Sequence, residues 1–194
     1  MSATWAFAVL ILSCTSLFAQ SSPNIAVETV NLRVTRSVLA KIEFENFEYP
    51  VAFKDGSATR TVILRSGRSA TASRSREEYE LVRVWRSHTP QGPVAIVSLL
   101  QIAVGGSSSQ HYLVYVFTQD SIGSRLLQFL KIDAQVPGSG VAFDSQHRTL
   151  TVKGRYKDES PHCCPRELEI VSYRWSDDGR FVLHDIHRQP VPER

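Results

Sequence analysis

Apolar and polar residues alternate in short segments through most of the chain, a pattern that predicts β-strands with one buried face. The segments are rich in Val, Ile, Tyr, Phe and Trp, and turn residues separate them. Residues 31–40 and 126–132 fit either a helix or a strand. The clearer strands are predicted at 41–47, 51–53, 61–64, 79–85, 94–104, 112–118, 141–143, 150–152, 168–175 and 181–186. Roughly nine short strands at this spacing predict a mainly β fold, a single antiparallel-sheet domain, with a β-dominated α+β fold as the alternative.

Two turns in this pattern are specific enough to predict hairpins. Asp55-Gly56 separates two apolar segments, and Asp177-Asp178-Gly179 separates another two. Residues 65–78 are rich in Ser and Arg and lack apolar spacing, so an exposed loop is predicted there. Residues 20–31 are predicted to be a polar entry segment before the first element.

The first twenty residues carry no charge and contain an apolar run over 5–12, the length of a signal-peptide core. Cleavage after Ala19 would leave a single β-rich domain over 20–194, exported to the periplasm or the extracellular space. The alternative is lipidation at Cys14, because Ile11-Leu12-Ser13-Cys14 loosely resembles a lipobox. After signal removal, no apolar run is long enough for a transmembrane helix.

The overall charge is mild, with 22 Lys and Arg against 19 Asp and Glu. Export and the lack of aromatic residues interleaved with the basic ones argue against a nucleic-acid partner. Seven arginines nevertheless fall between Arg60 and His88. An Arg-rich loop over 60–88 is therefore a candidate contact for an anionic surface or another envelope protein, although a solvated loop explains the same composition. The sequence does not otherwise identify a partner.

Cys163 and Cys164 are adjacent and are the only cysteines outside the signal segment. In an exported protein they either form a vicinal disulfide, serve a redox or metal role, or remain free thiols. A bond between neighbours is strained, because Cα atoms across a trans peptide are about 3.8 Å apart and disulfides usually need about 4.4–6.8 Å. Such a bond is easily reduced. The pair is therefore the disulfide or redox candidate.

No motif indicates a particular reaction. Gly105-Gly106-Ser107-Ser108-Ser109 lacks the second glycine of a nucleophile elbow. His162 lies next to the cysteines, but on a strand His184 and His187 would point to opposite faces unless a bulge intervenes. We therefore expect no catalytic residue, no metal and no cofactor.

Several segments of the second half resemble those of exported bacterial proteins similar to the LppP/LprE-type lipoproteins, a group without an assigned biochemical activity. The matching segments, within residues 80–182, are Val94-Ala95-Ile96-Val97, Gly105-Gly106-Ser107, Tyr112-Leu113-Val114-Tyr115-Val116-Phe117, Cys163-Cys164-Pro165, Tyr173-Arg174-Trp175 and Gly179-Arg180-Phe181. The resemblance implies an exported β-rich fold and no activity. Relatives often carry a carboxylate-rich run where this chain has Ser87-His88-Thr89-Pro90-Gln91-Gly92-Pro93, so a calcium site is not expected at that loop.

These observations favour an exported or envelope-associated binding or structural module without catalytic activity. A secreted hydrolase with dispersed active-site residues and a thiol-redox protein that uses Cys163 and Cys164 are the alternatives.

Overall fold

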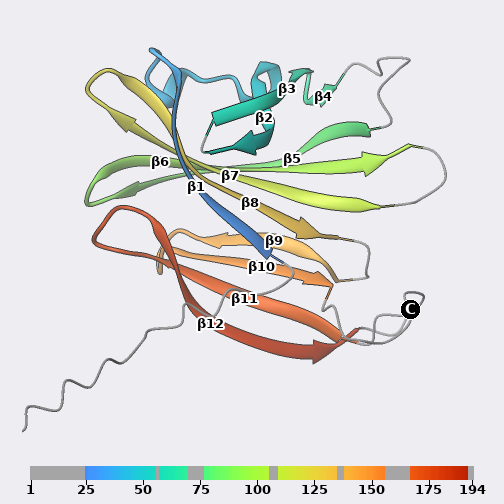
Figure 1. The fold of residues 1–194 in the computed structure, drawn as a ribbon. Helices are drawn as coiled ribbons and strands as arrows, with labels where there is room; N and C mark the ends of the chain where they lie inside the picture. The colour runs from blue at the N-terminus through green and yellow to red at the C-terminus, as the bar shows by residue number, and fades with distance from the viewer. Residues whose placement is uncertain are drawn as a thin grey trace, which may run out of the picture.

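The computed structural model describes residues 25–55, 57–69, 77–104, 109–134, 138–155 and 167–191. Within these residues the protein is mainly β and has two antiparallel sheets, of eight and four strands (Figure 1). The strands are β1 (Ile25–Thr35), β2 (Glu48–Lys54), β3 (Ser57–Arg65), β4 (Arg68–Ser69), β5 (Glu77–Thr89), β6 (Gly92–Ala103), β7 (Gln110–Asp120), β8 (Gly123–Asp133), β9 (Gly140–Asp144), β10 (Thr149–Arg155), β11 (Glu167–Trp175) and β12 (Phe181–Pro190). Two short 3-10 helices, η1 (Leu39–Lys41) and η2 (Phe44–Asn46), connect β1 to β2.

The large sheet has the strand order β1-β8-β7-β6-β5-β4-β3-β2. Strands β5 to β8 form an antiparallel meander, and β1 pairs with the outer edge of β8. The sheet curls so that β2 and β3 lie over one face of the meander, while the small sheet, in the order β12-β11-β10-β9, lies against the other (Figure 1). The meander is thus the middle layer of the molecule.

Each face of the meander has its own core. The core under β2 and β3 is aromatic, with Tyr49 and Tyr115 ring centroids 5.1 Å apart. The core against the small sheet is mostly aliphatic and is closed by Trp175 and Phe181, whose ring centroids are 5.0 Å apart. Because both faces are covered, 94–99 and 113–117 are continuously buried, as in strands without a solvent face.

The mainly β prediction is confirmed, and so are both predicted hairpins. Asp55 lies in the turn between β2 and β3 with a φ of 50°, and Gly179 lies in the β11–β12 turn with a φ of 76°. Residues 126–132, which fitted a helix or a strand, belong to β8. No helix in the described part of the chain is long and apolar enough to cross a membrane.

The prediction of an exposed loop over 65–78 is wrong at both of its ends, where the structure has a tight turn and strands. Ser66 and Gly67 form a tight turn with φ values of 52° and 81°, conformations that favour short turns over extended chain. The turn returns the chain along β3 as β4, and β5 begins at Glu77. Of the predicted loop, 70–76 lie outside the described residues.

The strand predicted at 41–47 is also wrong, because this segment forms η1 and η2. Ile42 and Phe44 are both buried, and this spacing of two resembles a strand. Side-chain hydrogen bonds instead bind the backbone carbonyls of this segment. Arg86 donates to Leu39 O and Ile42 O at 2.7 and 2.8 Å, and the Tyr49 hydroxyl donates to Phe44 O at 2.7 Å. The polar entry segment predicted at 20–31 is corrected as well, since β1 begins at Ile25.

Candidate functional site

Four polar side chains form a line across the meander at one end of the face that carries the aromatic core. In the strand register, Tyr79 pairs with Gln101, Gln101 with His111, and His111 with Asp133. Directly opposed residues of antiparallel strands point to the same face, so these side chains form one polar row. Tyr79 belongs to the aromatic core, which places the row on the concave side of the curled sheet.

One end of the polar row is tightly hydrogen-bonded. The Tyr79 hydroxyl donates to Glu77 Oε2 at 2.7 Å and accepts from Arg60 at 3.0 Å and from Gln101 Nε2 at 3.3 Å. Burial, reinforced by the hydrogen bond to Glu77, raises the pKa of Tyr79 well above its usual value, so it stays a neutral phenol. Burial raises the pKa of Glu77, but the Tyr79 hydrogen bond and the Arg60 charge outweigh it and the net pKa is lowered. Glu77 is therefore a carboxylate at neutral pH.

The middle of the polar row contains two buried polar atoms without a partner. Gln101 Oε1 and His111 Nδ1 have no hydrogen-bond partner among the residues that the structure describes, although they belong to directly paired residues. Gln101 is only 6% exposed. An unpaired buried polar atom typically costs about 1–3 kcal/mol, so it marks a place where a ligand or a bound water completes the network.

His111 is a neutral imidazole at pH 7. Burial lowers its pKa below the usual range, and the positive charge of Lys131 lowers it further, against the opposing effect of Asp133 and Glu77. A neutral imidazole has one donor and one acceptor nitrogen. The middle of the row therefore presents an amide acceptor and an imidazole nitrogen side by side, beside an ordered phenol and a carboxylate.

This arrangement is suited to holding a polar group by hydrogen bonds. Among the described residues, no group of three or more His, Cys, Asp or Glu side chains is arranged to hold a metal ion. No serine, threonine or cysteine belongs to the row, so it does not form a nucleophile–base pair of the kind that acyl-transfer enzymes use.

The cysteines predicted from the sequence lie elsewhere. Cys14, Cys163 and Cys164 fall outside the described residues, as does the neighbouring His162. The lipidation and disulfide predictions therefore stay predictions.

The two histidines near the chain end are both placed. The β11–β12 pairing passes from Ser172↔Asp185 to Tyr173↔Leu183, so His184 is an extra residue in a β-bulge. Regular alternation would place His184 and His187 on opposite faces of the strand. The bulge breaks this alternation between them, which corrects the regular strand assumed from the sequence.

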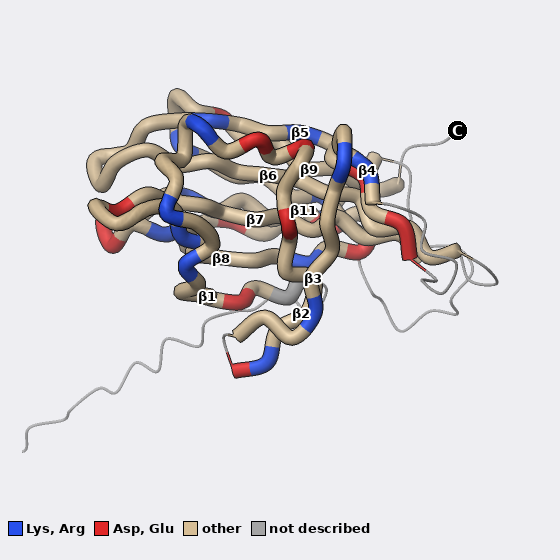
Figure 2. The backbone as a smooth tube through the Cα atoms, turned by 90° about the horizontal axis from the view of Figure 1, so that it is seen from above, with Lys and Arg blue, Asp and Glu red and all other residues tan. Residues whose placement is uncertain are grey.

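The arginines of residues 60–88 that the structure describes lie on strands, so the predicted Arg-rich loop is corrected for that part of the segment. They lie on β3, β4 and β5, and Figure 2 shows acidic positions beside them. Arg60 pairs with Glu77 at 2.7 Å, Arg68 pairs with Glu80 at 3.0 Å, and Arg86 binds backbone carbonyls. Arg74 and Arg76 lie outside the described residues.

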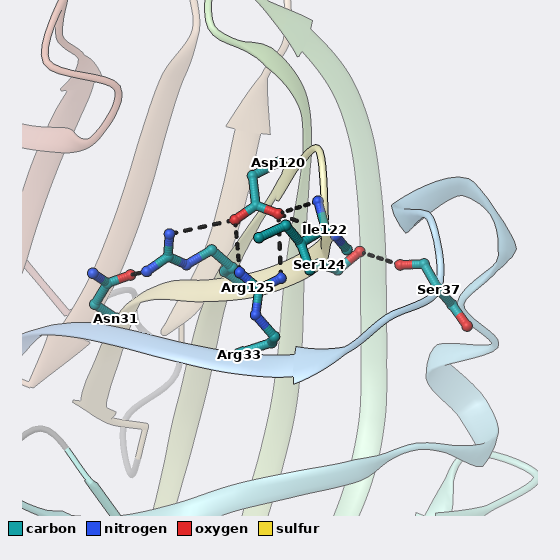
Figure 3. A network of polar contacts seen from close by, with 8 residues as sticks. Asn31, Arg33, Ser37, Asp120, Ile122, Ser124 and Arg125 are labelled. Carbon is teal, nitrogen blue, oxygen red and sulfur yellow. Dashed lines mark hydrogen bonds and ion pairs between the residues drawn. The ribbon is translucent and has the colours of Figure 1, made fainter.

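A second polar network joins the edge strand β1 to the β7–β8 turn (Figure 3). Asp120 accepts hydrogen bonds from the backbone N–H groups of Ile122 and Gly123 at 2.8 and 3.0 Å, and it pairs with Arg33 and Arg125. Arg125 also donates to Asn31 on β1. Because Asp120 binds the turn and both arginines at once, this network anchors β1. Arg125 Nε is nevertheless a buried atom without a hydrogen-bond partner among the described residues.

The sequence contained a signal for the polar row that motif analysis missed. Gln101 interrupts the apolar run of β6, and His111 directly precedes the apolar run of β7, on the other side of the intervening glycine- and serine-rich segment. Polar residues placed symmetrically about a hairpin lie opposite each other. Tyr79 and Asp133 can be assigned to the row only when the pairing register of all four strands, β5 to β8, is known.

Fold and row together define a mainly β protein with a buried polar row on the concave face of a curled sheet. Comparison with family models, with curated proteins and with solved structures finds no match to this chain.

Proposed function

We propose that this protein is an exported binding module without catalytic activity, which holds a small polar group of a ligand at the polar row. The observation that carries the proposal is the adjacent pair of unpartnered buried atoms, Gln101 Oε1 and His111 Nδ1, among the described residues. The neighbouring side chains of Tyr79, Glu77 and Arg60 are held in place by hydrogen bonds to one another, so a ligand would meet a preorganised site.

Export is the second element of this proposal and rests on the chain's N-terminus. Residues 1–19 have the apolar core and small-residue end of a signal peptide. The expected location is the periplasm or the extracellular space. The mass of the exported protein should begin near Gln20, whereas a diacylglyceryl group on Cys14 would instead indicate a lipoprotein.

The binding proposal is tested by native mass spectrometry of protein purified from its own compartment. We expect a noncovalent adduct on the wild-type protein that is lost on denaturation. Gln101→Met keeps the volume but removes the acceptor, so the adduct should fall about tenfold, the effect of one lost hydrogen bond to a buried group. Gln146→Met, at an exposed turn position, is the matched control. An adduct equally abundant in both variants, or none in the wild type, would contradict the proposal.

A further inference from the structure

The outer face of the small sheet, turned away from the aliphatic core, carries a polar depression of about 520 Å³. Its floor comes from two neighbouring strands: Thr149 of β10 pairs with Arg174 of β11, and Thr151 pairs with Ser172. Asp185 of β12 extends the second pair by one strand. All these residues line the depression, so the strand register itself builds a hydroxyl-rich floor with one guanidinium.

The bulge on β12 completes the rim on one side. In a regular strand, His184 and Asp185 would point to opposite faces. The extra residue at His184 changes this alternation, and both side chains line the depression. Bulges that re-aim a side chain are frequent next to binding sites.

The opposite rim is held in place by an ordered turn. Asp144 Oδ2 lies 2.7 Å from His147 Nδ1, and Asp144 Oδ1 accepts the backbone N–H groups of Gln146 and His147 at 2.8 and 3.0 Å. These bonds fix the carboxylate and the imidazole at the edge of the depression before any ligand arrives.

The central guanidinium is available to a ligand. No hydrogen bond or ion pair engages the Arg174 side chain within the part of the chain that the structure describes, and this side chain is exposed. Arginine offers five N–H donors and no acceptor, whereas the hydroxyls of Thr151 and Ser172 both donate and accept. The depression thus combines donors and acceptors within one surface.

The charges of the lining select among ligand classes. The lining holds one guanidinium against two carboxylates, and each carboxylate lies beside a histidine, Asp144 at 2.7 Å from His147 and Asp185 at 3.2 Å from His187. The depression therefore has no excess of fixed positive charge that would attract an anion. The described residues contain no metal-binding group of three or more side chains. A neutral ligand with many hydroxyl groups matches the lining, because each hydroxyl can donate to a carboxylate and accept from the guanidinium.

We propose that this depression binds a neutral carbohydrate, with Arg174 donating to one sugar hydroxyl and Asp185 accepting from another. The site lies on the face of the small sheet opposite to the meander and is independent of the polar row. Its open, shallow form suits one or two units of an extended chain rather than an enclosed monosaccharide, and the binding is expected to be weak because few groups are desolvated.

The test uses the full chain in solution and follows backbone amide chemical shifts by NMR. Cellotetraose and tetra-N-acetylchitotetraose are the neutral probes, and trigalacturonate is the anionic one. We expect at least one neutral probe to shift amides of β10, β11 and β12 in a saturable way. Arg174→Met should weaken this binding about fivefold or more, and Ser172→Ala should weaken it less.

Arg180→Met is the matched control, because Arg180 is exposed on the β11–β12 turn outside the depression and pairs with Asp178 at 3.8 Å. It should leave the affinity unchanged. An equal loss in both arginine variants, saturable shifts with trigalacturonate alone, or no saturable shift with any probe would overturn the proposal.

Discussion

Gln128 and the backbone of Phe181 join the two sheets through a pair of hydrogen bonds. Gln128 Nε2 donates to Phe181 O at 2.8 Å, and Phe181 N–H donates to Gln128 Oε1 at 2.7 Å. Gln128 is 2% exposed and Phe181 3%. The side-chain amide thus takes the place of a neighbouring strand at the start of β12, and it fixes the position of the small sheet on the meander.

Replacing Gln128 by Met should destabilise the protein by roughly 2–4 kcal/mol, because it leaves a buried N–H and a buried carbonyl of Phe181 unpaired. The free energy of unfolding in urea, followed by tryptophan fluorescence, measures this. Gln146→Met changes the same side chain at an exposed turn and should stay within about 0.5 kcal/mol of the wild type. Equal stabilities for the two variants would show that the Gln128 pair does not hold the sheets.

The close approach of the two sheets at Gly154 gives a second prediction. A Cβ at this position would lie 2.7 Å from Ile132 Cγ2 and 3.0 Å from Asp133 O, so Gly154→Ala should cost about 1–3 kcal/mol through overpacking. Gly140 is paired with the neighbouring Lys153, and a Cβ there meets nothing within 4 Å. Gly140→Ala should be nearly neutral in the same urea experiment. An unchanged free energy of unfolding in Gly154→Ala would mean that the two sheets do not approach each other closely at Gly154 and Ile132.

The Asp120 network predicts a specific acid sensitivity. The hydrogen bond from Arg33, with the backbone N–H groups of Ile122 and Gly123 and the Arg33 charge, lowers the pKa of Asp120 to about 2, from a usual value of 3.8. A carboxyl whose folded pKa is lowered stabilises the fold above its unfolded pKa, and this contribution is lost as pH falls from about 4 to about 2.

Asp120→Asn should therefore lower the urea midpoint at pH 7 and lose less stability than the wild type between pH 4 and pH 2. Asp178→Asn, at an exposed turn position, is the control and should keep the wild-type pH dependence. An Asp120→Asn protein with the same pH dependence as the wild type would contradict the assigned role.

Strands β5, β6 and β7 and both glycine-containing hairpins could be predicted from the sequence, because aromatic and β-branched apolar segments and turn residues are local signals, whereas the β8 segment 126–132 fitted a helix equally well. Strand β1 could not, since its pairing with β8 shifts between Thr29 and Leu32 and this shift breaks the alternation. The 3-10 segment was missed for a different reason. Its conformation depends on Arg86, whose hydrogen bonds to Leu39 O and Ile42 O span more than forty residues of sequence.

The polar row was predictable only in part. Gln101 stands out in an apolar run and His111 stands at the start of another, but the missing partners of Gln101 Oε1 and His111 Nδ1 become visible only when burial is known. The depression on the small sheet depends on a bulge, which inserts one residue without a sequence motif at His184. The rest of each site depends on pairing between segments far apart in the sequence, Tyr79 with Gln101 in one and Thr149 with Arg174 in the other, and no local pattern fixes that register.

The most direct test of the binding site is the imidazole nitrogen spectrum of His111 at pH 7. Because its pKa is lowered by burial and by Lys131, the ring is neutral at this pH and its Nδ1 shift reports hydrogen bonding rather than protonation. Protein purified from its own compartment is compared with the same protein unfolded, dialysed and refolded. We expect a changed His111 Nδ1 signal and an unchanged signal for His147, whereas identical His111 signals in the two samples would contradict ligand binding at the polar row.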